Sequence, residues 1–291
     1  MNKEQSICNK KVRGMDTFLY GCIYLSAAFA VALLLMIICY VAAKGIGRIT
    51  PEFLTTVTSA RKGTVGIAGN IVNTLYIIVI TLLIATPIGV GSAIYLNEYA
   101  KPGRLVRLIE FTTETLSGIP SIIFGLFGMV FFGTTLKLGY SLLTGSLTLS
   151  LMVLPLITRN TQEALRTVPD SYRSGALGMG ATKWHMIRTI LIPSSMPGII
   201  TGVILAIGRI VGESAALLFT AGSGYLLPKA GGWLSKILES GGTLTIQLYL
   251  SSSKAEYDVA FGIAFVLLII VLCINFLTKY LARRFDVTRL K

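Results

Sequence analysis

The sequence predicts an all-α membrane protein with six transmembrane helices. Of its 291 residues, 53% are hydrophobic and only 13% are charged, whereas about 25% of the residues in a soluble globular domain are charged. Several apolar runs reach the roughly 20 residues that are needed to cross a bilayer about 30 Å thick. The basic residues gather between these runs. An ordinary soluble enzyme is therefore excluded.

Six apolar runs predict the helices in chain order. They divide the chain into an N-terminal segment 1–17, a transmembrane domain 18–281 and a C-terminal tail 282–291. The predicted spans lie at about 18–43, 70–96, 115–136, 142–162, 194–220 and 259–281. The first run has 26 residues, whereas the apolar core of a secretory signal peptide has only about 7–15. We therefore expect this run to be a retained transmembrane helix.

The basic residues predict the orientation of the spans. If the N-terminus is cytoplasmic, 17 lysines and arginines lie in cytoplasmic segments, eight lie in outer loops and Arg209 lies within a span. Because cytoplasmic loops carry an excess of lysine and arginine, both termini are predicted to be cytoplasmic. This distribution also accounts for the net charge of +13. We therefore expect membrane lipid and no nucleic acid as a partner.

Four predicted spans contain a proline, which removes a helix hydrogen bond and can bend the helix. These prolines are Pro87, Pro120, Pro155 and Pro197. Bent helices can line a transport path, although proline is common in membrane helices in general. The span at 194–220 also carries Gly198-x-x-x-Gly202 and Gly208-x-x-x-Gly212. Such small residues let another backbone approach, so we expect a helix interface there.

The sequence lacks the motifs of an enzyme or a metal site. No segment reads Gly-x-x-x-x-Gly-Lys-Ser/Thr, the loop whose backbone amides hold nucleotide phosphates. The single histidine, His185, lies in a loop and has no candidate nucleophile beside it. The four cysteines, Cys8, Cys22, Cys39 and Cys273, have no metal or disulfide spacing. We expect no catalytic residue, no metal ligand and no cofactor bound by this chain.

The loop 163–193 is the most specific feature of the sequence. Pro169 and Asp170 suit the start of one short helix, Gly180 suits a turn, and Thr182 suits the N-cap of a second helix. Four residues are then expected to be partly exposed: Tyr172, Ala176, Leu177 and Met179. An apolar helix of this kind either docks into a groove on a partner or lies on the membrane surface. Both interpretations are open on physical grounds.

This loop resembles the EAA loop of ABC importer permeases. The family pattern is Glu-Ala-Ala, three residues, Gly, nine residues, then Ile-x-Leu-Pro. Here Gly180 is followed after nine residues by Ile190, Leu191, Ile192 and Pro193, while Ser174, Gly175 and Ala176 stand where Glu-Ala-Ala would. The resemblance implies a coupling helix that docks on an ATP-binding subunit. The implied coupling residues are Tyr172, Ser174, Gly175, Ala176, Leu177 and Gly180.

Three further stretches are similar to the phosphate permeases of this family: AIYLNEYA at 93–100, LSGIPSIIFGLFG at 116–128 and GRIVGESAALLFTAG at 208–222. Sulfate and molybdate permeases typically have Phe-Gly where Ser214-Ala215 stand here. The resemblance implies a type I ABC importer permease with the MetI-like fold in the bacterial cytoplasmic (inner) membrane. Permeases for another oxyanion, ion-driven secondary transporters and membrane-embedded enzymes are the alternatives.

The same resemblance implies partners and a cofactor. The partners are a sister permease of the PstC type, two copies of an ATP-binding subunit of the PstB type and an extracytoplasmic phosphate-binding protein of the PstS type. ATP and Mg would be bound by the ATP-binding subunit and not by this chain. The chain would form the translocation path with its sister permease.

Arg209 and Glu213 are the predicted translocation residues. They are four residues apart in one predicted span, so they can pair with each other on a helix. An ionised side chain at the bilayer centre costs at least about 2.5–3.5 kcal/mol and therefore usually faces the protein interior. The pair could also serve only to hold the bundle together. The family resemblance implies that Arg209 attracts the anion and that Glu213 keeps its affinity low enough for release.

Overall fold

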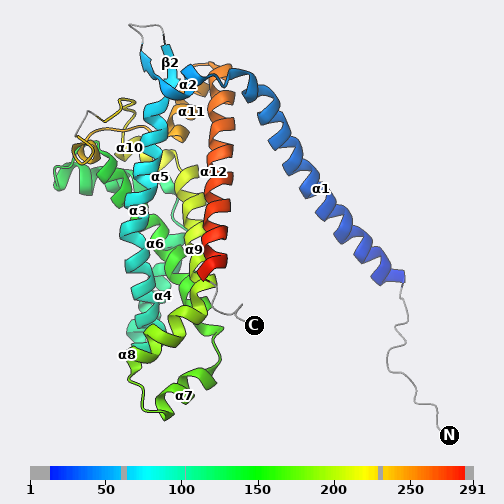
Figure 1. The fold of residues 1–291 in the computed structure, drawn as a ribbon, viewed down its shortest axis with the longest axis vertical. Coiled ribbons are helices and arrows are strands. Elements are labelled where there is room, and N and C mark those ends of the chain that lie inside the picture. Colours follow the sequence, from blue (N-terminus) through cyan, green and yellow to red (C-terminus); the bar gives the residue numbers. More distant parts are fainter. Residues whose placement is uncertain (1–13, 60–63, 102, 229–231, 286–291) are drawn as a thin grey trace.

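The structure is a computed structural model that describes residues 14–59, 64–101, 103–228 and 232–285. Helices dominate it, and the long ones form an elongated bundle (Figure 1). Five segments are long and apolar enough to cross a membrane: Thr17–Arg48, Ala68–Tyr99, Leu142–Arg166, Lys183–Gly212 and Tyr257–Tyr280. The prediction of an all-α membrane protein is confirmed.

These segments contain the long helices of the bundle. They are α1 (Gly14–Gly45), α3 (Ala68–Ile94), α6 (Leu142–Arg166), α9 (Ile192–Gly212) and α12 (Tyr257–Phe285). A π-helical turn, η2 (Tyr95–Tyr99), extends α3, and a second, η4 (Ile187–Leu191), leads into α9. Pro87 and Pro155 lie inside α3 and α6, which continue through them.

The predicted span 115–136 is not one straight helix. It begins in the last turn of α4 (Arg104–Ser117) and continues in α5 (Ser121–Gly128) and the π-helical turn η3 (Met129–Thr135). The two parts meet at an angle of 102° and count as a sixth span only if they are taken together. The bend lies at Gly118–Pro120, because a proline without an N–H and a residue forced into extended backbone before it cannot continue α4.

The predicted span 194–220 is also broken. α9 ends at Gly212, and a separate short helix, α10, covers Ala215–Thr220. Between them Glu213 has an extended backbone with φ −82° and ψ 127°. Both helices are apolar, so hydropathy alone joined them into one predicted span.

α6 is the centre of the bundle. In its most apolar stretch 67% of the residues are buried, compared with 33% in the segments of α3 and α9 and none in that of α1. The main core packs α3, α9, α10 and α12 around it, with Ile77, Leu149, Val153 and Ala206 fully or almost fully buried. The other elements are therefore held in place by their contacts with α6, directly or through a neighbour.

α1 stands apart from the bundle. It contacts the rest of the chain near its C-terminal end, where the Tyr40 ring meets the Phe261 ring edge-on at 5.7 Å and Gly45 lies against the backbone of Phe261. From there it slopes away from α12 (Figure 1). Its apolar surface is therefore available to lipid or to another subunit.

Short elements close the two ends of the bundle. At the end where α12 begins lie η1 (Ile46–Arg48), α2 (Pro51–Thr55), a hairpin of β1 (Val57–Ser59) and β2 (Thr64–Ile67), η5 (Ser235–Leu238) and α11 (Leu244–Ser253). The two strands are antiparallel, with Val57 paired to Ile67. At the opposite end lie α7 (Asp170–Gly178) and α8 (Lys183–Met186) (Figure 1).

The two glycine pairs of α9 have different surroundings. A Cβ added at Gly202 would lie 2.8 Å from the Asn160 Cβ of α6, and one at Gly198 would collide with Ala164. Cβ atoms added at Gly208 and Gly212 would have no atom of another described element within 4 Å. The first pair thus lets α9 lie close against α6, and the second pair leaves open space beside the end of α9.

Gly198→Leu should destabilise the folded chain, because the new side chain must enter the α6 contact. Overpacking of this kind typically costs about 1–3 kcal/mol. We expect a lower thermal unfolding temperature for the detergent-solubilised protein. Gly208→Leu is the matched control on the same helix and should leave that temperature unchanged. Equal stability of the two variants would contradict the packing role of Gly198.

Candidate functional site

The loop 163–193 folds as two short helices joined by a glycine turn. Gly180 has φ +85°, a conformation that glycine adopts without strain. Thr182 caps α8, since its hydroxyl accepts the N–H of His185 at 3.3 Å. These are the turn and cap that the sequence predicted. They bring α8 back beside α7, so that the loop makes a core of its own.

Ala176 belongs to that core. Its side chain is 3% exposed and packs among Leu165, Val168, Met186, Ile187 and Leu191. The expectation that Ala176 is partly exposed is therefore wrong, because α7 turns this face onto the end of α6 and onto α8 and η4. A small side chain at this position serves contact within the chain.

The opposite face of the loop is exposed and partly apolar. Tyr172 is 52% exposed, Leu177 49% and Met179 85%. Ser174, Gly175, Gly180 and His185 are exposed as well, as is Trp184 of α8. Of the predicted coupling residues, all but Ala176 thus lie where a partner could reach them. Trp184 was not among the predicted coupling residues.

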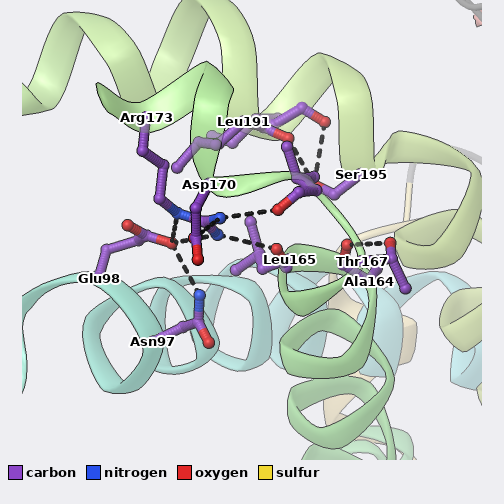
Figure 2. Close-up of polar contacts among 11 residues, drawn as sticks. Asn97, Glu98, Ala164, Leu165, Thr167, Asp170, Arg173, Leu191 and Ser195 are labelled. Carbon is purple, nitrogen blue, oxygen red and sulfur yellow. Dashed lines mark hydrogen bonds and ion pairs between the residues drawn. The ribbon is translucent and has the colours of Figure 1, made fainter. Parts of the chain in front are cut away.

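Arg173 holds α7 in place (Figure 2). Its guanidinium donates to the Glu98 carboxylate from Nη2 at 3.0 Å and from Nε at 3.3 Å. It also donates to the carbonyls of Leu165 at 2.9 Å and Val168 at 2.8 Å, and to the Asp170 carboxylate at 3.0 Å. The Glu98 side chain is 5% exposed and that of Arg173 19%. This arrangement joins α7 to the ends of α6 and α3.

The sequence offered only indirect signals for this contact. Glu98 lies in the stretch AIYLNEYA, and Arg173 stands next to the position where the family pattern begins. The two residues are 75 positions apart. Nothing in the local sequence indicates that they meet.

Arg209 and Glu213 are separated by the end of α9. Glu213 is 9% exposed, and its carboxylate accepts the N–H of Ala216 at 3.0 Å at the start of α10. Its carbonyl accepts the hydroxyl of Thr245 at 2.8 Å. Arg209 lies in the last turn of α9 and is exposed. Among the residues that the structure describes, no ion pair joins Arg209 to Glu213.

A polar cavity that the sequence did not reveal lies between α4 and α6. It has a volume of about 330 Å³. Arg159 pairs with Glu114 at 3.1 Å, and Arg166 pairs with Glu110 at 3.5 Å. The amide nitrogen of Gln162, which also lines the cavity, is buried without a hydrogen-bond partner among the described residues. The spacing of these residues on α6, three or four apart, was the signal available in the sequence.

The described residues hold no cluster of three or more histidine, cysteine, aspartate or glutamate side chains that could bind a metal ion. Cys22, Cys39 and Cys273 are free thiols on exposed positions of α1 and α12.

Residues 85–287 match the family model described as binding-protein-dependent transport system inner membrane component. The chain is 40% identical over 214 residues to the probable ABC transporter permease protein YqgI of Bacillus subtilis, an alignment that covers 74% of this chain and 72% of that protein. It is 30% identical over 265 residues to the phosphate transport system permease protein PstA of Haemophilus influenzae, covering 91% and 92%.

A solved structure of a bacterial alginate ABC transporter, in complex with an alginate pentasaccharide-bound periplasmic protein, contains a chain of similar fold. The TM-score is 0.69 at 15% identity, and the match covers 94% of this chain and 96% of that one. At this identity the likeness concerns the fold. The shared fold extends over most of the chain.

Ala176→Trp should disorganise the loop without any partner present, because the core around Ala176 has no room for an indole ring. We expect a lower thermal unfolding temperature of the purified chain and faster proteolysis between α6 and α9. Leu177→Trp, one position further on the exposed face, is the control and should change neither. If Ala176→Trp leaves both measurements unchanged, Ala176 is not packed in the core of the loop.

Proposed function

Because the chain belongs to the family of binding-protein-dependent transport system inner membrane components, we propose that it is the permease subunit of an ATP-driven phosphate importer. The observation that supports phosphate as the substrate is the 30% identity to PstA of Haemophilus influenzae over 91% of this chain. The chain is a multi-pass membrane protein whose work is transport and not catalysis.

The loop 163–193 is the surface that an ATP-binding subunit would engage. Its core is closed on one side, while Tyr172, Leu177 and Met179 are exposed on the other. Exposed apolar side chains in water usually have a partner, and a short helix in a groove is a common form of such contact. ATP and Mg belong to that subunit, since the sequence of this chain has no phosphate-binding loop.

A second permease would complete the transport path. α1 buries none of its apolar stretch in this chain, and Arg209 is exposed near the end of a membrane-spanning helix. A charged side chain exposed to lipid is costly, so Arg209 needs a water-filled path or another subunit beside it. The open space at Gly208 and Gly212 lies on the same part of α9. We assign the path to this region, between the chain and a sister permease.

Glu213 would act on the same path from the break after α9. Its carboxylate accepts the N–H of Ala216 in α10, which fixes the position of the side chain. Arg209 lies four residues earlier in the chain. Its negative charge would weaken the binding of an anion at Arg209 and favour release. An extracytoplasmic binding protein would deliver phosphate at the end of the bundle opposite the loop 163–193. In this orientation both termini would lie in the cytoplasm of a bacterial cell.

Arg209→Gln should reduce phosphate uptake because a neutral amide attracts the anion less. A hydrogen bond to a charged group is worth about 1.5–3 kcal/mol, which corresponds to roughly tenfold or more in binding. We expect a loss of this size in vesicles that contain the assembled complex, measured with radioactive phosphate. Lys279→Gln, which removes a basic residue near the end of α12, should transport normally.

Glu213→Gln complements this test. The amide oxygen can still accept the N–H of Ala216, so the fold should be retained while the charge is lost. We expect slower uptake through slower release. Near-normal rates in both the Arg209 and the Glu213 variants would remove these residues from the path, and loss of the assembled complex would indicate that the substituted residue has a purely structural role.

The orientation can be tested with reporter fusions. Alkaline phosphatase, which is active only outside the cytoplasm, should be active when fused after Gly232 and silent when fused after Thr182, because the balance of basic residues places the second site inside. As a control, both fusion proteins should be present at full length in the cells that express them. The reverse pattern would overturn both the orientation and the docking of an ATP-binding subunit at the loop.

A further inference from the structure

The guanidinium of Arg173 is fully used by the protein itself. An arginine side chain has five N–H donors. Nε donates one hydrogen bond to Glu98, Nη2 donates to Glu98 and to the carbonyl of Leu165, and Nη1 donates to the carbonyl of Val168 and to Asp170. No donor is left for a partner. Arg173 therefore connects parts of this chain and does not face an ATP-binding subunit.

The connection to Glu98 differs from the others. Leu165, Val168 and Asp170 are within eight residues of Arg173, so the chain itself already keeps them near. Glu98 is 75 residues away, on the π-helical turn that ends α3. Its Oε1 also accepts the side-chain amide of Asn97 at 2.7 Å (Figure 2). A carboxylate that is 5% exposed depends on such donors, because burial of an unpaired charge is unfavourable.

Two further contacts support the same junction. The Lys183 ammonium of α8 lies 4.9 Å from the centre of the Tyr99 ring, and Ile94 at the end of α3 packs against the core that contains Ala176. The loop 163–193 thus touches the end of α3 through an ion pair, a cation–π contact and an apolar contact. Covalent linkage exists only to α6 and α9.

α3 continues this connection to the other end of the bundle. Asn70 donates to the carbonyl of Gly242 at 2.9 Å, Asn73 donates to that of Gly224 at 3.0 Å, and the hydroxyl of Thr74 accepts the N–H of Leu244 at 3.0 Å. Thr245, next to Leu244, donates to the carbonyl of Glu213. These hydrogen bonds connect α3 to Gly224 and to residues 242–245, and through Thr245 to the break at Glu213.

We propose that Arg173 is a positioning residue that transmits the movement of α7 to α3 through Glu98. This role rests on the proposed function, because an ATP-binding subunit is what would move α7. When α7 is displaced, the salt bridge makes α3 move together with α6, and the far end of α3 carries the shift to the transport path. Without it, the loop is linked to α3 only by the Lys183–Tyr99 contact, the Ile94 contact and the packing of α3 on α6, and the movement of α7 reaches α3 less completely.

Arg173→Lys is the variant that tests this role. A lysine keeps the charge, but its single ammonium cannot reach two elements with a flat array of donors. In proteoliposomes with the full complex, we expect ATP hydrolysis to continue at a similar rate while phosphate uptake falls by about tenfold, within the usual range of coupling between sites. The measured quantity is the ratio of ATP hydrolysed to phosphate transported.

Matched variants separate this role from support of the fold. Arg104→Lys makes the same change at an exposed arginine of α4, outside the loop 163–193. This variant should keep the wild-type ratio. Glu98→Gln keeps an acceptor oxygen without the charge and should have a smaller effect than Arg173→Lys. This order of effects would support the transmitting role.

A cross-link provides a rescue. In a protein whose four native cysteines are replaced by serine, Arg173→Cys combined with Glu98→Cys should be uncoupled, and a short bifunctional thiol reagent should restore uptake. Neither single cysteine variant should respond. If Arg173 served only to give the loop surface a positive charge, the cross-link would not restore uptake.

Three results would overturn the role of Arg173. One is an unchanged ratio in Arg173→Lys, a second is loss of the ATP-binding subunit together with uptake, and a third is a cross-linked protein that stays uncoupled. In each of these the wild-type complex still transports phosphate. If the wild-type complex hydrolyses ATP and moves no phosphate, the proposed function itself fails and the role of Arg173 fails with it.

Discussion

The close packing of α3 and α9 on α6 is the contact on which the rest of the structure depends. Between helices in lipid there is little hydrophobic driving force, so association relies on close van der Waals packing. Small residues allow this close packing, with Gly89 of α3 facing Ile157, and Gly198 and Gly202 of α9 facing Ala164 and Asn160 in the same C-terminal part of α6. Because α6 and α9 are fixed in this way, the loop between them starts and ends at defined positions. The loop can then close a core around Ala176 and present its other face outward.

Polar contacts also join the helices where they end. The ends of α3 are tied by Asn70 and Asn73 on one side and by Glu98 on the other. Apolar contacts between helices tolerate small sliding movements, whereas hydrogen bonds to particular carbonyls do not. The bundle therefore has polar contacts at the ends of α3 in addition to the hydrogen bonds that join α3 to α6 in its middle, from Thr81 to Ser146 at 3.4 Å and from Ser150 to Thr81 at 3.3 Å. Such a construction suits a protein in which a movement at one end has to reach the other without loss of register.

The chain leaves several surfaces without a partner of its own. α1 stands away from the bundle, and the aromatic group of Phe127, Phe131 and Phe132 on α5 and η3 presents two exposed rings. Arg209 and the open space beside Gly208 and Gly212 lie on the exposed part of α9. These are surfaces that the proposed sister permease would cover. The break at Glu213 lies on the transport path that we propose.

The sequence by itself determined the class of the protein, five of its membrane-spanning segments and the turn and cap of the loop at Gly180 and Thr182. These follow from apolar length, from a positive φ that glycine adopts and from a hydroxyl that caps a helix, all of which act over a few residues. Only the tertiary structure decided the 102° bend before Pro120, the end of α9 at Gly212 and the separation of Arg209 from Glu213. It also decided that Ala176 is buried while Leu177 is exposed, and that Arg173 meets Glu98. Each of these depends on which helix lies opposite, and the contacts that decide this join residues far apart in the chain.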